Sequence, residues 1–130
     1  MQFKECYQNP FIEERADPYI TLGPDGFYYF TASYPMKSAD DKDGYDRVIL
    51  RRAKDISELA SAEEITIWKV ADTTLTHRFI WAPELHYIAG RWYVFYAGSE
   101  DKENNWAFDC HVLVCDSDDP YTGTWSEKGK

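Results

Sequence analysis

The sequence predicts an all-β protein, a partial β-propeller made of about two four-stranded blades. Short segments rich in Tyr, Phe, Trp, Val and Ile alternate with turn residues, and helical periodicity is weak nearly everywhere. These segments form two similar sets of four, and four strands per repeat is the arrangement of a propeller blade. The alternative is an eight-stranded sandwich in which the two sets are similar only by coincidence.

The first set of strands is expected at residues 17–22, 26–33, 46–53 and 65–70. Proline fixes its own φ and favours extended geometry in the residue before it, so Asp17-Pro18 predicts a turn leading into a strand. A catalytic carboxylate held at the mouth of a sheet would give the same pattern. The Gly-Pro-Asp-Gly sequence at 23–26 predicts a hairpin turn, and residues 54–64 predict a turn or two of helix.

The second set is expected at residues 80–88, 91–98, 107–115 and 123–127, with a hairpin turn at "IAGR". The stretch "ADPYITLGPDGFYYFTASY" aligns with "APELHYIAGRWYVFYAGS", because each has a small residue, Pro and an acid before a strand, a Gly turn and an aromatic strand. The offset is 64 residues from Gly26 to Gly90 and 66 from Ser33 to Ser99. We therefore expect one domain, 1–130, with blade one at about 16–70 and blade two at about 79–127.

Charge and hydropathy narrow the choice of partner. The net charge of −9 argues against nucleic acid and anionic membrane surfaces, so a neutral partner such as a sugar fits better. No apolar run approaches the roughly 18 residues that a membrane span needs. The first ten residues contain no apolar signal segment, which predicts a cytoplasmic chain as written, or a secreted one if a signal lies outside it.

Neither a metal nor another cofactor is expected. The three cysteines and three histidines lack metal-site spacing, and we expect reduced thiols and structural imidazoles: Cys6, Cys110, Cys115, His77, His86 and His111. The acidic stretches at 38–46 and 116–120 are interpreted as solvated loops, since the first lacks the Glu of a calcium-binding EF-hand.

Two blades cannot close a ring, because propellers have roughly four to eight blades. The blade faces and edges left open would need cover. We therefore expect either a fragment or a unit that closes its propeller by forming a homo-oligomer.

The segment "FIWAPELHYIAGRWYVFYAG", together with "RADPYI", closely resembles glycoside hydrolase family 43. The resemblance extends from about Asn9 to Trp125 and includes the Asn-Pro pair before "ADPYI" and the segment "DSDDPYTGTW". It implies a five-bladed propeller that cleaves arabinose- and xylose-containing polysaccharides. The Glu of "WAPEL", followed by a His, is more similar to arabinofuranosidase members than to xylosidases.

The resemblance also implies roles for individual residues. In this inverting family one carboxylate activates a water and a carboxylic acid protonates the leaving oxygen, with roughly 6.5–9.5 Å between them. Asp17 matches the general base. The expected sugar-binding residues are Trp81, Ala82, Pro83, Glu84 and His86. The expected partner is carbohydrate, namely arabinan, arabinoxylan or a related oligosaccharide.

The family's general-acid Glu and the Asp that tunes its pKa belong to later blades, so the resemblance implies a base without its acid. We expect the chain alone to be inactive. One alternative is a non-catalytic half-propeller that self-assembles and at most binds sugars. Another is a complete enzyme of a different β class, with Asp17 and Glu84 as its own acid and base.

Overall fold

The computed structural model describes residues 7–35, 44–76, 78–100, 103 and 106–130. These residues form eight strands and two short 3-10 helices. In chain order the elements are β1 (Ala16–Leu22), β2 (Tyr28–Ser33), β3 (Arg47–Ala53), η1 (Ile56–Ala60), β4 (Ile65–Lys69), η2 (Val70–Asp72), β5 (Arg78–Ile88), β6 (Arg91–Ser99), β7 (Phe108–Cys115) and β8 (Trp125–Gly129). Every strand boundary lies within two residues of the expected one.

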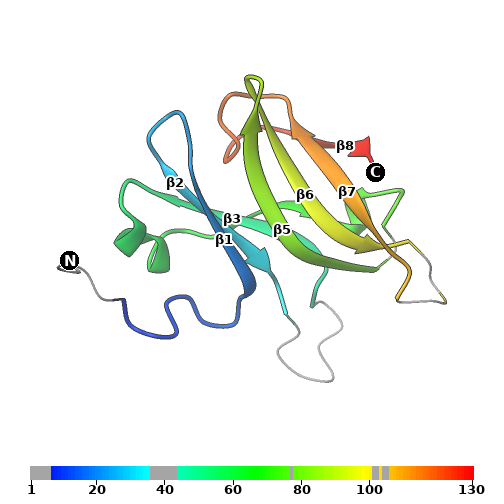
Figure 1. Cartoon of the computed structure of the whole chain (residues 1–130), viewed down its shortest axis with the longest axis horizontal. Helices are drawn as coiled ribbons and strands as arrows, with labels where there is room; N and C mark the ends of the chain where they lie inside the picture. Colours follow the sequence, from blue (N-terminus) through cyan, green and yellow to red (C-terminus); the bar gives the residue numbers. More distant parts are fainter. Residues whose placement is uncertain (1–6, 36–43, 77, 101–102, 104–105) are drawn as a thin grey trace.

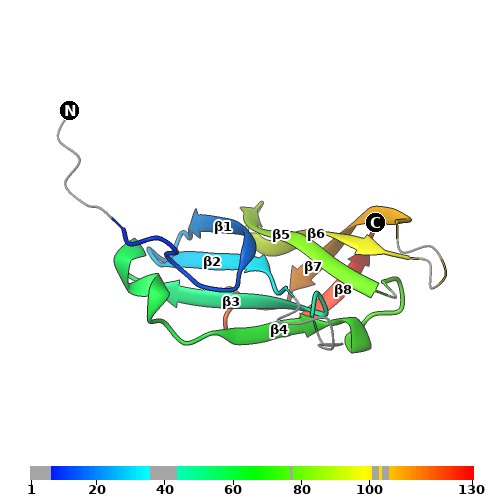
Figure 2. The ribbon, with the colours of Figure 1, turned by 90° about the horizontal axis from the view of Figure 1, so that it is seen from below.

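The strands form two antiparallel sheets, β1-β2-β3-β4 and β5-β6-β7-β8, each in chain order (Figures 1 and 2). The first strands of the two sheets, β1 and β5, contact each other. Short turns join β1 to β2 and β5 to β6, and longer connections join the other neighbours, so each sheet is the four-stranded meander that the repeat predicts. Within the described residues, neither helix is long and apolar enough to cross a membrane.

The hairpin turns are formed by residues with positive φ, a conformation that glycine adopts readily and alanine does not. Ala89 (φ 49°) and Gly90 (φ 82°) both lie in the left-handed region, as in the type I′ turn that joins twisted strands. In the first sheet, Gly26 has φ 76°. Asp25 in the same turn accepts a 2.6 Å hydrogen bond from the Tyr29 hydroxyl. Burial, together with this carboxylate, raises the pKa of Tyr29 well above its ordinary value.

The main hydrophobic core lies between the two sheets. Alternate side chains of β3, β6 and β7 point to this side, as the period of two requires. The cluster comprises Tyr29, Val48, Leu50 and Trp68 from the first sheet and Ile80, Leu85, Trp92, Val94, Tyr96, Leu113, Cys115 and Trp125 from the second. A second cluster covers the other side of the first sheet, where the fully buried Leu59 of η1 packs with Phe30 and Ile49.

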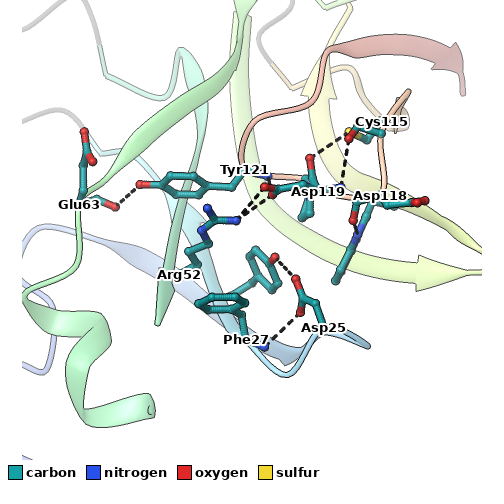
Figure 3. Close-up of polar contacts among 12 residues, drawn as sticks. Asp25, Phe27, Arg52, Glu63, Cys115, Asp118, Asp119 and Tyr121 are labelled. Atoms are coloured by element: carbon teal, nitrogen blue, oxygen red, sulfur yellow. Dashed lines mark hydrogen bonds and ion pairs between the residues drawn. The ribbon is translucent and has the colours of Figure 1, made fainter. Parts of the chain in front are cut away.

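Polar contacts also join the two sheets (Figure 3). Arg52 on β3 donates to both carboxylate oxygens of Asp119, each at 2.9 Å, and its guanidinium lies 4.5 Å from the centroid of the Tyr121 ring. The Tyr121 hydroxyl donates to the carbonyl of Glu63. The expectation that 116–120 is a solvated loop holds for the exposed Asp116 and Asp118 but is wrong for Asp119, which contacts the opposite sheet, and for Pro120, which is buried.

One side of the second sheet is only partly covered. We define the outer face as the alternate side chains of β6 and β7 that lie opposite one another: Tyr93, Phe95, Ala97, Cys110, Val112 and Val114. Each of these residues is half-buried or exposed. Two grooves of about 440 and 460 Å³ lie along it.

Candidate functional site

Asp17 lies on a β-bulge at the start of β1. Ala16 pairs with Ser33 and Tyr19 pairs with Thr31, so Asp17 and Pro18 together face a single residue of β2. Asp17 adopts φ 49° rather than the extended geometry expected before proline. A bulge bends its strand and re-aims the side chain. The carboxylate consequently lies exposed at the edge of the two-sheet structure rather than alternating into the core.

Ser33 links this carboxylate to the second sheet. Its buried hydroxyl donates a 2.9 Å hydrogen bond to Asp17 Oδ2 and accepts a 2.7 Å hydrogen bond from the backbone N–H of Ala82. Both bonds have ordinary geometry for their types. The Ser33 hydroxyl thus fixes Asp17 relative to β5.

Ala82 is the structural counterpart of Asp17. It also precedes a proline, has φ 46° and lies in a bulge, between the Trp81–Ala97 and Glu84–Phe95 pairs. The acids of the two repeats therefore do not coincide, since Asp17 precedes its proline and Glu84 follows Pro83.

The register also corrects the serine alignment. Ser33 pairs with Ala16, just before the first bulge, and Ala97 pairs with Trp81, just before the second. Ser33 therefore corresponds to Ala97, and the expected match with Ser99 is wrong. The first bulge carries a carboxylate and a hydroxyl where the second carries two alanine methyl groups.

An ion-pair cluster anchors the chain just before Asp17. Arg15 contacts both carboxylate oxygens of Glu64, and Arg51 on β3 donates to Glu64 Oε2 at 3.0 Å. Burial raises the pKa of Glu64, but the two guanidinium groups outweigh it and hold the pKa below its ordinary value. Arg15 also lies over the Tyr34 ring. These contacts restrain the segment that leads into the bulge.

Glu84 and His86 lie on one side of β5, as their spacing predicts. Glu84 is exposed, and its Oε2 lies 2.9 Å from His86 Nε2. The imidazole ring contacts Tyr19 of β1, with ring centroids 5.3 Å apart. Pro83, by contrast, is buried. Its position after Ala82 shapes the bulge and leaves no exposed surface for a ligand.

Trp81 is the centre of an aromatic cluster that we call the aromatic rim: Tyr45, Phe79, Trp81, Trp106 and Phe108. Trp81 stacks on Phe108 with centroids 4.3 Å apart and on Phe79 at 5.4 Å. Its Nε1 is buried and has no hydrogen-bond partner among the described residues. Unpaired buried donors are rare and costly, and they call for an explanation.

The imidazole of His111 is buried and stacks on Tyr96, as a structural histidine would, but neither ring nitrogen has a hydrogen-bond partner among the described residues. His77 and Cys6 lie outside the described residues, as does most of the acidic stretch at 38–46. Cys110 and Cys115 are free thiols, as predicted. Over the described ranges, no three His, Cys, Asp or Glu side chains are grouped to hold a metal ion.

Three residues of this region had not been predicted from the sequence. Ser33 is inconspicuous at the end of an apolar strand, and only the register shows that it faces Asp17. Tyr45 and Trp106 each precede a strand and contact Trp81, at 5.8 and 6.1 Å between ring centroids. An aromatic residue in a polar segment, as in "ENNWAF", is the one sequence signal that could have indicated Trp106.

Comparison with known proteins gives consistent similarities. The sequence model of "Glycosyl hydrolases family 43" matches residues 7–130. The chain is 43% identical over 124 residues to the extracellular exo-α-(1→5)-L-arabinofuranosidase of Streptomyces avermitilis, covering 95% of this chain and 24% of that protein. It is 42% identical to α-L-arabinofuranosidase 43 of Humicola insolens, with the same coverage of both proteins.

Solved structures show the same similarity to arabinofuranosidases. The α-L-arabinofuranosidase from Lactobacillus brevis has a TM-score of 0.79 at 40% identity, over 95% of this chain and 38% of that one. A β-xylosidase/α-arabinofuranosidase from a compost metagenome has a TM-score of 0.67 at 20% identity, which shows the fold alone. The two sheets are therefore part of a five-bladed propeller, and the sandwich alternative is wrong. The chain spans about a quarter to a third of the curated relatives it matches.

Proposed function

Because this chain belongs to family 43 of the glycosyl hydrolases, we propose that it carries the general-base half of an inverting glycosidase site, with Asp17 as the base. The observation that carries the proposal is the exposed carboxylate at the β1 bulge, held by Ser33. In an inverting reaction such a carboxylate takes a proton from the water that attacks the anomeric carbon. Family membership also removes the alternative of an enzyme from a different β class.

We assign the sugar-binding surface beside the base to the segment from Trp81 to Glu84 and to His86. An exposed carboxylate beside an imidazole offers both acceptors and a donor to sugar hydroxyls. Ala82 leaves room at the position equivalent to Asp17, and its backbone is held by Ser33. Pro83 contributes by fixing the bulge, and Trp81 contributes an aromatic wall.

The proposed substrate is an arabinose-containing polysaccharide or oligosaccharide, such as arabinan or arabinoxylan. The relatives at 42–43% identity are named as arabinofuranosidases, and the first of them as an exo-acting enzyme on α-(1→5) linkages. The net charge of −9 suits a neutral glycan better than an anionic one.

We further propose that the general acid and the Asp that tunes it are supplied from outside these 130 residues. General acid catalysis typically contributes 10²–10⁴-fold to the rate, and an alkoxide leaving group depends on it. We therefore expect the isolated chain to release no arabinose from arabinan at a rate typical of a glycosidase.

A chimera tests the base assignment. Residues 1–130 are joined to the remainder of the Lactobacillus brevis arabinofuranosidase, and release of arabinose from α-(1→5)-arabinotriose is measured. We expect an active chimera that loses at least roughly 100-fold in kcat on Asp17→Asn and keeps its activity on Asp118→Asn. A fully active Asp17→Asn chimera would show that Asp17 is not the base, and arabinose release by the isolated chain would show that no outside acid is needed.

The second candidate is a non-catalytic half-propeller that self-assembles. The partly exposed aromatic and aliphatic side chains of the outer face favour it. A second copy covering this face would bury apolar surface that a lone chain leaves in water.

A further inference from the structure

Trp106 is an unusually exposed aromatic residue. Its exposed fraction is 80%, whereas Tyr7 and Tyr87 are 42% and 41% exposed. A tryptophan carries a large apolar surface together with an N–H donor, so burying it against a ligand is strongly favourable. A side chain of this kind held at the surface is therefore a candidate contact for a partner molecule.

The aromatic rim holds Trp106 in place. The indole meets Trp81 edge to face, with centroids 6.1 Å apart and an interplanar angle of 65°. Trp81 is itself fixed by its stack on Phe108. The two indoles meet at a steep angle, and most of the surface of Trp106 is exposed to solvent.

The rim lies at the same end of the sheets as Asp17. Ala16, next to Asp17, pairs with the last residue of β2, and Tyr45 precedes the neighbouring strand β3, which runs antiparallel to β2 (Figure 1). In the second sheet Phe108 begins β7 and pairs with the last residue of β6. A hydrogen bond of 2.6 Å from Ile80 N to the Tyr45 carbonyl joins these two ends.

A short chain of contacts also connects the rim to the proposed base. Trp81 precedes Ala82, whose N–H donates to Ser33, and Ser33 donates to Asp17. The groove of about 460 Å³ on the outer face extends to Ala82 and Glu84 of β5 and to Phe108 of the rim. A sugar held at Asp17 would therefore have its neighbours in the glycan close to the rim.

We propose that Trp106 forms a second sugar subsite, which stacks against a pentose adjoining the one held at Asp17. The inference rests on the proposed function, because it assumes that a glycan binds at Asp17. The occupant is a neutral oligosaccharide of at least two pentose units, whose ring C–H groups pack on the exposed indole. A contact between a bound sugar and Trp106 is accordingly expected of an oligosaccharide and not of free arabinose.

Binding to the 130-residue chain tests this subsite by NMR. The chain has five tryptophans, and each indole N–H gives a separate signal. Arabinose, α-(1→5)-arabinobiose and α-(1→5)-arabinotriose are titrated in turn. We expect the biose and triose to shift the Trp106 indole signal and the amide signals of Asp17 and Ala82, and arabinose to shift the amide signals only. The indole of Trp125, which donates to the Pro120 carbonyl, should not move.

Substitutions at Trp106 distinguish the loss of ring stacking on the sugar from a general loss of folding. Trp106→Ala should weaken triose binding roughly three- to tenfold and leave arabinose binding unchanged. Trp106→Phe keeps a ring and should bind the triose within about twofold of the wild type. Tyr87→Ala is the matched control, because it removes an exposed aromatic ring at the far end of β5 and should change neither affinity.

The outcomes distinguish this subsite from the proposed function. If the triose shifts Asp17 and Ala82 while the Trp106 indole stays still, or if Trp106→Ala binds as tightly as the wild type, the subsite is wrong and the base assignment stands. If Trp106 shifts without Asp17 or Ala82, the connection between them is wrong. If none of these signals shifts, both the Trp106 subsite and the sugar-binding surface beside Asp17 are wrong for this chain. If Trp106→Ala abolishes self-association instead of sugar binding, the partner is protein.

Discussion

The hydroxyl of Ser33 donates to the carboxylate of Asp17 at 2.9 Å while accepting from the backbone of Ala82 at 2.7 Å. One buried side chain therefore holds the proposed base in the first sheet and the sugar-binding segment in the second. Since Asp17 adopts a positive φ that is uncommon for a non-glycine residue, its position depends on such surrounding contacts.

Replacing Ser33 by alanine should destabilise the chain and release Asp17. We expect the free energy of unfolding in urea to fall by about 1 kcal/mol, since a typical net hydrogen bond contributes 0.5–1.5 kcal/mol. Hydrogen exchange at the Ala82 amide should become faster, because its acceptor is gone.

Thr31 provides a matched control on the same strand. Its hydroxyl is buried but has no hydrogen-bond partner among the described residues. Thr31→Val keeps the shape of the side chain and removes an unsatisfied group, so its stability should equal or exceed that of the wild type. Equal losses in Ser33→Ala and Thr31→Val would show that the Ser33 contacts contribute nothing specific.

Glu64 should make stability depend on pH in the acid range. Burial raises its pKa, but Arg15 and Arg51 lower it further, so the folded-state pKa lies below the ordinary value of 4.5. A lowered folded-state pKa stabilises the fold at pH values above 4.5, and this contribution is lost as the pH falls through the lowered value. Glu64→Gln should remove it, at a cost of roughly 1–3 kcal/mol at neutral pH.

The measurement is chemical unfolding of the wild type and Glu64→Gln from pH 3 to pH 7. The difference between the two should be constant near neutrality and shrink towards acid pH. Glu13→Gln, at an exposed position, should show a pH profile parallel to that of the wild type. A difference that grows towards acid pH would contradict the assignment of the shift to Arg15 and Arg51.

Arg52 should be more sensitive to substitution than a surface arginine usually is. It joins β3 to Asp119 of the opposite sheet with two 2.9 Å bonds and lies over the rings of Tyr121 and Phe27. Lysine keeps the charge but loses the bidentate geometry and the planar stacking. We expect Arg52→Lys to lower the unfolding free energy by about 1 kcal/mol.

Arg47→Lys is the comparison for Arg52. Arg47 is on the same strand, pairs with its sequence neighbour Asp46 and lies over the ring of Tyr34, which follows β2, so these two contacts stay within the first sheet. Their loss should lower the melting temperature less than Arg52→Lys does. Equal melting temperatures for the two variants would mean that the contact between the sheets is not specific to Arg52.

The sequence was sufficient to predict the strands because aromatic and β-branched segments alternate cleanly with Gly and Pro turns. The Asp-Pro pair predicted that Asp17 lies where a strand begins, but not the backbone conformation of Asp17, because the bulge overrides the extended preference before proline. It could not reveal Ser33, since the partner of a strand residue depends on register, and one bulge changes the register by a residue. The role of Asp119 was missed because its partner lies 67 residues away.

The outer face of the second sheet makes self-association testable. Phe95 lies in the middle of this face and is only half-buried, so a second copy covering it would bury apolar surface. Sedimentation of the purified chain over a range of concentrations should show a dimer or larger closed species.

Phe95→Lys should then sediment as a folded monomer. Lysine is chosen because Glu84 lies directly opposite and would repel an acidic side chain. Tyr87→Lys, on the other side of the sheet, should associate as the wild type does. A wild-type chain that stays monomeric at all concentrations would rule out the half-propeller that closes on itself and leave the enzyme-part proposal standing.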